Sequence, residues 1–237
     1  MTALAIRGPL LYNDLWNIAM EAKLMQFNRE QLLLYAVTDR AWVGRQTLAE
    51  QIEDALTGGA TLIQLREKDL DAESFLREAV QAREICHRYG VPLIINDNVD
   101  VALKAGADGV HVGIEDAPVK EIRRRVGADF IIGATAKTVE QAQLAQESGA
   151  DYLGVGAVFP SPTKRSAIRI TGDQLRAICA SVDIPAVAIG GISLDNARAL
   201  CGCGVQGIAV VSAIFAAQDI VSATAELRRA AEDVVGR

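Results

Sequence analysis

Short runs of aliphatic and β-branched residues alternate with amphipathic stretches along most of the chain. The runs are apolar at nearly every position instead of at every second one. Such continuous runs are typical of strands that are covered on both faces, as in a parallel sheet. The pattern predicts eight strands, over residues 33–38, 61–66, 92–96, 109–113, 130–135, 152–156, 185–190 and 207–211.

The amphipathic stretches between these runs carry helix start and stop signals. Thr47 and Glu50 have the spacing of a capping box, and Gly58 follows the last apolar position of that helix. A longer apolar stripe ends at Gly90, and Ser193 is positioned to cap another helix. The pattern predicts helices over 47–57, 71–89, 118–126, 138–148, 193–202 and 219–235.

Eight strand–helix units in about 200 residues are close to the usual size of a (βα)8 barrel. A glycine-led segment also recurs before every second strand, at 59–63, 106–110, 149–153 and 204–208. This fourfold repetition favours a closed barrel over an open doubly wound sheet. We therefore predict one α/β domain, a (βα)8 TIM barrel spanning residues 33–237.

Residues 1–32 lie outside the repeating pattern. Apolar positions over 14–27 predict an amphipathic helix, which would make this segment a helical N-terminal extension. The alternative is that Met25 is the natural start and that the upstream residues are dispensable. The sequence leaves both interpretations open.

Composition narrows the class of protein. The 237 residues carry a net charge of −6, which argues against a nucleic-acid-binding surface. Two histidines are too few for a multi-histidine metal site, and the four cysteines form no C-x-x-C pair. No apolar stretch is long enough for a membrane helix, and the first 25 residues lack signal-peptide features. We expect a cytoplasmic protein, with a homo-oligomer among the open possibilities.

Polar residues gather where the second predicted strand ends. Gln64, Arg66 and Lys68 alternate with apolar residues, so they share one face of the strand. Gln64 and Arg66 should point into the barrel, where an unpaired charge is costly and an anionic ligand would compensate it. The alternative is a structural ion pair with a carboxylate of a neighbouring strand.

Carboxylates follow the third and fourth strands. Asp97 comes directly after Asn96, and Asp116 lies in the next loop beside Glu115. Adjacent carboxylates near basic groups suit a Mg²⁺ ion shared with substrate phosphates. Each aspartate taken alone could instead cap a helix.

The loops after the last three strands suit phosphate groups. The loop after strand 6 carries hydroxyls and cations over 159–165, although a plain solvated loop has the same composition. Gly190-Gly191 and Ser212 follow strands 7 and 8, the common phosphate-binding position of this fold. Substrates with phosphate groups are therefore expected.

In this order, the features resemble the thiamine phosphate synthase family from about residue 34 to residue 234. The resemblance rests on segments 64–68, 96–97, 115–116, 162–164, 190–192 and 211–212. It implies a transferase that joins a hydroxymethylpyrimidine diphosphate to a thiazole phosphate, which forms thiamine phosphate and releases diphosphate. Diphosphate would depart with the help of Mg²⁺, and the thiazole nitrogen would attack the resulting pyrimidine cation.

The resemblance also implies roles for individual residues. The pyrimidine diphosphate would be bound by Gln64, Leu65, Arg66, Glu67, Lys68, Asn96, Thr135 and Lys164. The thiazole phosphate would be bound by Ser161, Pro162, Thr163, Gly191, Val211 and Ser212. Asp97 and Asp116 would bind Mg²⁺, and Arg66, Lys164 and Thr135 would be the catalytic residues.

Some positions depart from the family pattern. Ile114 stands where glutamine is frequent, and Thr135 and Ser161 exchange one hydroxyl residue for another. Three alternatives stay open: a related thiazole tautomerase, another phosphate-handling barrel, and a non-catalytic binding module. The combination of the 64–68 cluster with both Asp97 and Asp116 favours the synthase.

Overall fold

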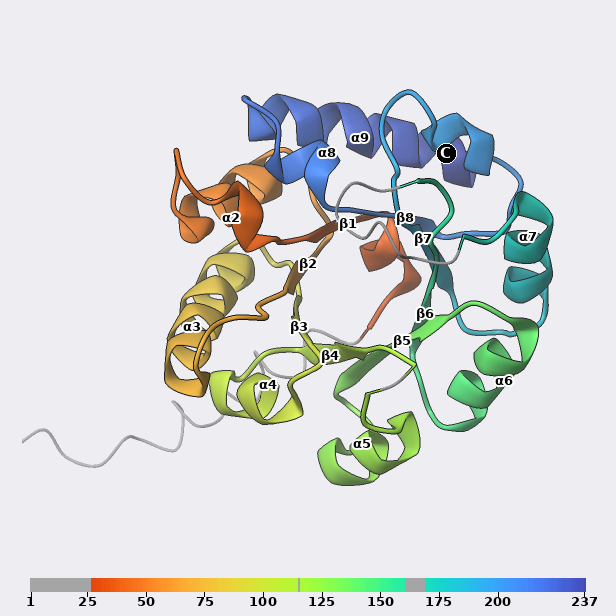
Figure 1. Cartoon of the computed structure of the whole chain (residues 1–237), viewed down its shortest axis with the longest axis horizontal. Helices are drawn as coiled ribbons and strands as arrows, with labels where there is room; N and C mark the ends of the chain where they lie inside the picture. The colour runs from red at the N-terminus through yellow and green to blue at the C-terminus, as the bar shows by residue number, and fades with distance from the viewer. Residues whose placement is uncertain (1–26, 115, 161–168) are drawn as a thin grey trace, which may run out of the picture.

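The protein is described by a computed structural model that covers residues 27–114, 116–160 and 169–237. Eight parallel strands close into a barrel in the order β1 to β8, and helices surround the ring of strands (Figure 1). The strands are β1 Leu34–Val37, β2 Leu62–Leu65, β3 Leu93–Asn96, β4 Gly109–Val112, β5 Ile131–Ala136, β6 Tyr152–Gly156, β7 Ala186–Ile189 and β8 Gly207–Val210. The predicted (βα)8 barrel is confirmed, with every strand at its predicted place.

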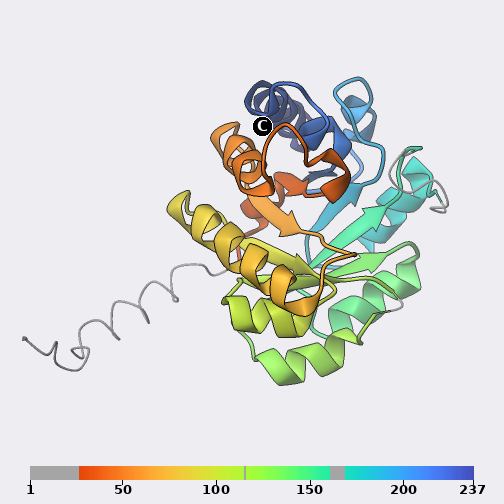
Figure 2. The ribbon, with the colours of Figure 1, turned by 60° about the vertical axis from the view of Figure 1, so that its left-hand side comes forward.

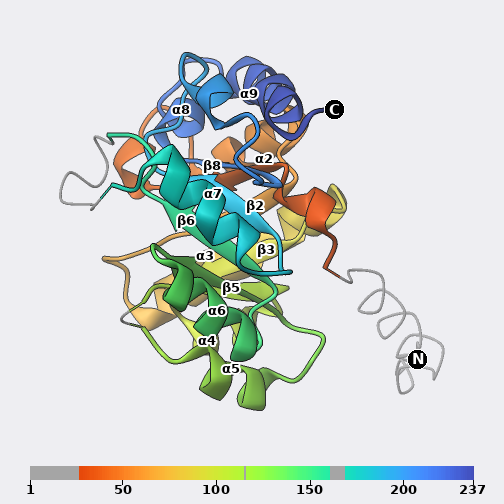
Figure 3. The same ribbon diagram turned by 90° about the vertical axis from the view of Figure 1, so that its right-hand side faces the viewer.

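The helices lie outside the ring, with α2 and α3 side by side (Figure 2) and α6 and α7 next to β5 and β6 (Figure 3). Their bounds are α2 Leu48–Thr57, α3 Ala72–Arg88, α4 Val99–Ala105, α5 Val119–Val126, α6 Val139–Glu147, α7 Gly172–Ala180, α8 Ser212–Phe215 and α9 Ile220–Val235. Short 3₁₀ helices are η1 Arg29–Leu32, η2 Arg40–Trp42 and η3 Ala197–Leu200. No helix in the part of the chain that the structure describes has the length and hydropathy to cross a membrane.

The prediction of an α-helix over 193–202 is wrong, because only the short 3₁₀ helix η3 forms there. The side chain of Asn196 accepts a hydrogen bond from the backbone N–H of Ser193 and donates one to the carbonyl of Gly191. These bonds fold the segment back onto the end of β7, so Ser193 starts a turn and caps no α-helix. The capping box predicted at Thr47 and Glu50 does form at the start of α2.

Two apolar layers hold the barrel together. The larger lies between strands and helices and includes Leu65, Phe75 and Leu227. The smaller fills the lumen, the space inside the ring of strands, and includes Tyr35, Tyr152 and neighbouring aliphatic residues. Because each strand is buried on both sides, its sequence is apolar throughout, which is the pattern that revealed the strands.

Glycines in β5 and β6 make room for large side chains in the lumen. A Cβ atom on Gly133 would lie 2.2 Å from Cζ of Tyr152 and 2.4 Å from Nδ1 of His111. A Cβ on Gly154 would lie 2.9 Å from Cε1 of His111. The Tyr152 ring and the His111 ring therefore occupy space that side chains of β5 and β6 would otherwise fill.

The lumen is closed at the end where the strands begin. Leu32 is fully buried there, and the ring of Phe27 stacks on the ring of Tyr152 with centroids 5.6 Å apart. The other end, where the strands finish, carries the polar residues discussed below. Of the predicted extension, residues 1–26 lie outside the described residues, and the domain boundary after residue 32 stays a prediction.

Candidate active site

A depression lies at the carboxyl ends of β2, β3 and β4. Its lining includes Lys68, Asn96, Asp97 and the backbone around Ala117. The strands pair in the order β2–β3–β4, so residues that are distant in the sequence meet at this end of the barrel. The neighbourhood predicted for strands 2, 3 and 4 is confirmed.

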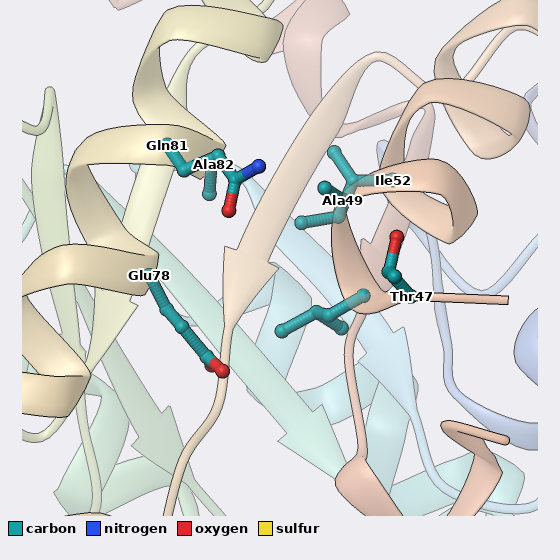
Figure 4. Close-up of a pocket in the computed structure, with 7 residues that line it drawn as sticks. Thr47, Ala49, Ile52, Glu78, Gln81 and Ala82 are labelled. Carbon is teal, nitrogen blue, oxygen red and sulfur yellow. The ribbon is translucent and has the colours of Figure 1, made fainter.

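A second hollow lies outside the barrel, between α2 and α3 (Figure 4). Leu48 and Ile52 line it from α2, and Glu78 and Gln81 line it from α3. None of the predicted site residues takes part in it. The depression at the strand ends is therefore the better candidate for chemistry.

The polar cluster of strand 2 divides between two sides of the barrel wall. Gln64 lies in the lumen, where its amide nitrogen donates to the hydroxyl of Tyr35 at 2.6 Å. Leu65 faces the helices and is fully buried. Arg66 follows the strand, and its Nη1 lies 3.3 Å from Oδ2 of Asp39 in the segment after β1. Arg66 thus has a carboxylate partner, as the ion-pair alternative required. The predicted alternation of side chains holds for Gln64 and Leu65.

The carboxylate of Glu67 forms an ion pair with Arg40. It accepts hydrogen bonds from Nε and Nη2 of Arg40 at 2.8 and 3.0 Å, and its side chain is 1% exposed. Arg40 also contacts Glu78 on α3 at 2.6 Å. Arg40, in the segment after β1, therefore connects the end of β2 to α3. Any ligand contact from Glu67 is left to its backbone, because the carboxylate is engaged.

Asp97 has an unusual backbone conformation directly after β3. Its φ angle is +61°, the one positive value at a non-glycine residue among those that the structure describes. Its carboxylate accepts a hydrogen bond of 2.5 Å from the side-chain amide of Asn96. Burial and then the carboxylate of Asp116 raise the pKa of Asp97 to about 6, while Lys68 acts in the opposite direction. Aspartate tolerates the left-handed region better than most residues, and residues in such conformations cluster at functional sites.

Neither aspartate caps a helix. Asn98 is the N-cap of α4, where its side chain accepts from the N–H of Val101. Asp116 accepts from the N–H of Gly113 at 2.6 Å, while α5 begins after Pro118 without a side-chain cap. The capping alternative is therefore excluded for both residues. What remains is a pair of carboxylates that repel each other at the edge of the depression.

Such a pair fits a divalent cation. Two carboxylates close enough to raise a pKa lose their repulsion when a cation lies between them. Among residues 27–114, 116–160 and 169–237, no three acidic, histidine or cysteine side chains gather into a larger ligand set. Two protein ligands suit Mg²⁺, which keeps several waters and also takes oxygens from substrate phosphates.

The repulsion has a measurable consequence for stability. In metal-free protein, Asp97→Asn should raise the free energy of unfolding by about 1 kcal/mol at pH 8, because the carboxylate pair is then relieved. Asn also tolerates the left-handed backbone. The pKa of about 6 in the folded state lies above the ordinary 3.8, so the penalty is absent below pH 4 and complete above pH 6.

Thermal unfolding with EDTA between pH 4 and pH 8 measures this effect. The melting temperatures of the wild type and Asp97→Asn should coincide at pH 4, separate as the pH rises from 4 to 6, and keep a constant difference above pH 6. Asp129→Asn, which changes an exposed carboxylate before β5, is the matched control and should follow the wild type. A difference that does not vary with pH would contradict the repulsion.

Thr135 and His111 lie in the lumen on adjacent strands. Nε2 of His111 is 3.1 Å from the hydroxyl of Thr135, and Nδ1 is 3.1 Å from the hydroxyl of Tyr152. Burial lowers the pKa of His111 to about 4, so the imidazole is neutral. Thr135 thus has a protein partner on its lumen side.

The ends of β7 and β8 hold the remaining described candidates. Gly191 has a φ angle of +66°, and a Cβ there would lie 2.2 Å from the carbonyl oxygen of Pro160. Val211 is the N-cap residue of the single-turn α8, which begins at Ser212. Glycine at position 191 is therefore required by its φ angle and by close packing against the loop after β6. The predicted residues Ser161, Pro162, Thr163 and Lys164 lie outside the described residues.

The sequence pattern did not reveal several residues that shape the site. Asp39 and Arg40 contact the strand 2 cluster from the loop after β1, and Tyr35, His111 and Tyr152 lie beneath it in the lumen. A polar atom on the ring of Tyr35, His111 or Tyr152 within a continuous apolar run is a signal that could have found these three residues, whereas Asp39 and Arg40 have no such signal. Ile114, where the family often has glutamine, is 47% exposed beside the Asp116 turn.

The chain is similar in sequence and in structure to known proteins of one family. The model of a family described as "Thiamine monophosphate synthase" matches residues 34–214. The thiamine-phosphate synthase of Ruminiclostridium cellulolyticum is 47% identical over 82% of this chain and 92% of its own length. That of Methanobrevibacter smithii is 45% identical over 81% of this chain and 91% of its own.

A comparison with solved structures leads to the same family. Thiamine phosphate pyrophosphorylase from Pyrococcus furiosus superposes with a TM-score of 0.81 at 42% identity, over 88% of this chain and 99% of that chain. A 3-hexulose-6-phosphate synthase from Salmonella typhimurium has a TM-score of 0.63 at 19% identity, over 85% of this chain and 99% of that chain. The second likeness shows the fold alone.

Proposed function

Since this chain belongs to the thiamine monophosphate synthase family, we propose that it is a thiamine-phosphate synthase that joins a pyrimidine to a thiazole. The substrates are 4-amino-2-methyl-5-hydroxymethylpyrimidine diphosphate and 4-methyl-5-(2-phosphoethyl)thiazole, or the carboxylated form of the thiazole. The products are thiamine phosphate and diphosphate. The protein is a transferase that acts on small molecules, and cytoplasmic location and homo-oligomerisation are parts of the proposal.

One observation supports this function most strongly. Lys68 after β2 and Asp97 after β3 line one depression, and the carboxylate of Asp116 lies against that of Asp97. A diphosphate carries several negative charges and would be repelled by the two carboxylates alone. A divalent cation held by Asp97 and Asp116 would neutralise the charge of the two carboxylates, and Lys68 would then leave the depression positive toward the diphosphate.

The leaving group determines what the protein must supply. When the bond between carbon and diphosphate breaks, negative charge grows on the diphosphate oxygens, and fixed positive groups stabilise it. Arg66 and Lys68 provide such groups at the end of β2, and we assign Lys164 the same role. Mg²⁺ held by Asp97 and Asp116 would add Lewis-acid stabilisation of the same charge.

The pyrimidine ring lies next to the lumen in this proposal. Gln64 and Thr135 present polar atoms there, and Asn96 is held by its hydrogen bond to Asp97. Leu65 and Glu67 contribute backbone atoms only, since their side chains are buried or paired. Fixing the ring beside the incoming thiazole nitrogen supplies part of the rate by orientation alone.

The thiazole phosphate occupies the opposite side of the barrel mouth. We assign its phosphate to the loops after β6, β7 and β8. The residues are Ser161, Pro162, Thr163, Gly191, Val211 and Ser212. Free backbone N–H groups at the start of α8 and at a glycine turn are suitable donors to phosphate oxygens.

The direct test is turnover with purified protein. The two substrates are mixed with Mg²⁺, and thiamine phosphate and released diphosphate are measured by chromatography. We expect both products in equal amounts, and none when EDTA replaces Mg²⁺. Folded protein that binds the substrates but forms no product would overturn the proposal, and thiazole tautomerisation would then be assayed with the same preparation.

A further inference from the structure

Five polar side chains form a continuous hydrogen-bonded chain across the lumen, which we call the lumen chain. Each comes from a different strand: Gln64, Tyr35, Tyr152, His111 and Thr135. Successive polar atoms are 2.6, 2.8, 3.1 and 3.1 Å apart. It connects two residues to which the proposed function gives substrate contacts, Gln64 at one end and Thr135 at the other.

The direction of the hydrogen bonds follows from the Gln64 end. The amide nitrogen of Gln64 can only donate, so the Tyr35 oxygen accepts and the Tyr35 proton needs another acceptor. That acceptor is the hydroxyl of Tyr152, 2.8 Å away. Tyr152 then directs its own proton to Nδ1 of His111.

The direction of the hydrogen bond between His111 and Thr135 follows from the direction at Tyr152. With Nδ1 as acceptor, a neutral His111 carries its proton on Nε2 and donates it to the hydroxyl oxygen of Thr135. The opposite direction would leave the Tyr35 proton without an acceptor, although Tyr35 is only 1% exposed. If both ring nitrogens of His111 carried protons, Nδ1 could not accept a hydrogen bond. The hydroxyl proton of Tyr152, which is fully buried, would then have no acceptor.

We propose that His111 is a positioning residue that holds the Thr135 oxygen as an acceptor, so that the Thr135 proton is donated to the pyrimidine diphosphate. The proposal rests on the proposed function for the identity of that ligand. When the Thr135 oxygen accepts from Nε2 of His111, its own proton points away from the imidazole and is available for donation into the half-buried space above it. A donor fixed there suits an oxygen that gains negative charge as diphosphate leaves.

The tautomer of His111 can be measured without any assay of activity. The chain contains two histidines, so ¹⁵N-histidine labelling gives two sets of ring signals, and a His87→Gln variant assigns them. Two-bond ¹H–¹⁵N correlation spectra at pH 7.5 should show His111 protonated on Nε2 alone. Protonation on Nδ1, or on both nitrogens, would overturn the proposal whether or not the protein turns over.

Kinetics separate positioning from a purely structural role. Gln at position 111 can place an amide near the Nε2 position, whereas Asn reaches only the Nδ1 position. We expect His111→Gln to keep kcat within about tenfold and His111→Asn to lower kcat about a hundredfold, with KM little changed. Thr135→Ser, which keeps the hydroxyl, should rescue most of the loss caused by Thr135→Val.

The variant that combines His111→Asn with Thr135→Val gives the decisive comparison. If His111 acts through Thr135, His111→Asn should cost nothing further in a Thr135→Val background. Losses that multiply in the double variant would mean that His111 supports the barrel generally, and would overturn the positioning role. Should His111→Asn fail to fold, the His111 tautomer in the wild type still decides the question.

Discussion

Replacing Asp97 and Asp116 together with asparagine should lower kcat at least about a thousandfold while the barrel stays folded. The two carboxylates are the ligands proposed for Mg²⁺, and asparagine removes both negative charges at nearly constant volume. Without the ion, the departing diphosphate loses its main counter-charge, which in comparable sites is worth several kcal/mol of barrier. Neither carboxylate caps a helix, so no helix loses its start.

Mg²⁺ titration of turnover and of binding measures this loss. Each single variant should need more Mg²⁺ for half-maximal rate, and the double variant should show no Mg²⁺-dependent rate. The control combines Asp129→Asn with Asp173→Asn, which makes the same change in net charge at exposed positions outside the depression. A double variant at Asp97 and Asp116 with undiminished, Mg²⁺-dependent turnover would place the ion elsewhere.

Alanine at Gly133 should destabilise the barrel severely, although the substitution adds a single methyl group. The new Cβ would overlap the Tyr152 ring at 2.2 Å and the His111 ring at 2.4 Å, and both rings are enclosed by other strands. Overpacking of this kind costs about 3 kcal/mol when neighbours cannot move. For a domain of this size, the melting temperature should fall by about 10 °C, or the protein should fail to accumulate in soluble form.

Thermal unfolding by circular dichroism checks this expectation. Gly172→Ala is the matched control, because a Cβ at this first residue of α7 meets no atom closer than 3.9 Å. It should leave the melting temperature unchanged or raise it slightly. If Gly133→Ala melts within about 2 °C of the wild type, the lumen rearranges more freely than close packing allows.

The barrel could be predicted from sequence because two separate signals agreed. Fully buried strands leave long apolar runs, and the glycine-led repeat marks every second unit. The type of helix after β7 was predicted wrongly, because the hydrogen bonds of Asn196 with Gly191 and Ser193 are local side-chain bonds that hydrophobic periodicity does not encode. The helix α7 was not predicted either, although Thr171 and Gln174 form a capping box there.

The site was predictable where residue type and strand end coincide. Asp97 and Asp116 follow adjacent strands, so their proximity follows from the topology. The partners of Arg66 and Glu67 could not be predicted, because Asp39 and Arg40 lie in the segment after β1 and Arg40 is placed by its contact with Glu78 on α3. His111 sits within an apolar run, and the sequence cannot tell which face of a fully buried strand a residue occupies.

The lumen chain can form only late in the folding of the protein. Tyr35 and Tyr152 are 117 positions apart, yet their hydroxyls meet only when β6 has come to face β1 across a finished ring. Contacts this distant in the sequence form late, because the loop entropy must first be overcome. A nascent or truncated chain that has only its early strands therefore lacks the continuous connection from Gln64 to Thr135. The proposed positioning of Thr135 by His111 would therefore arise only when the barrel closes.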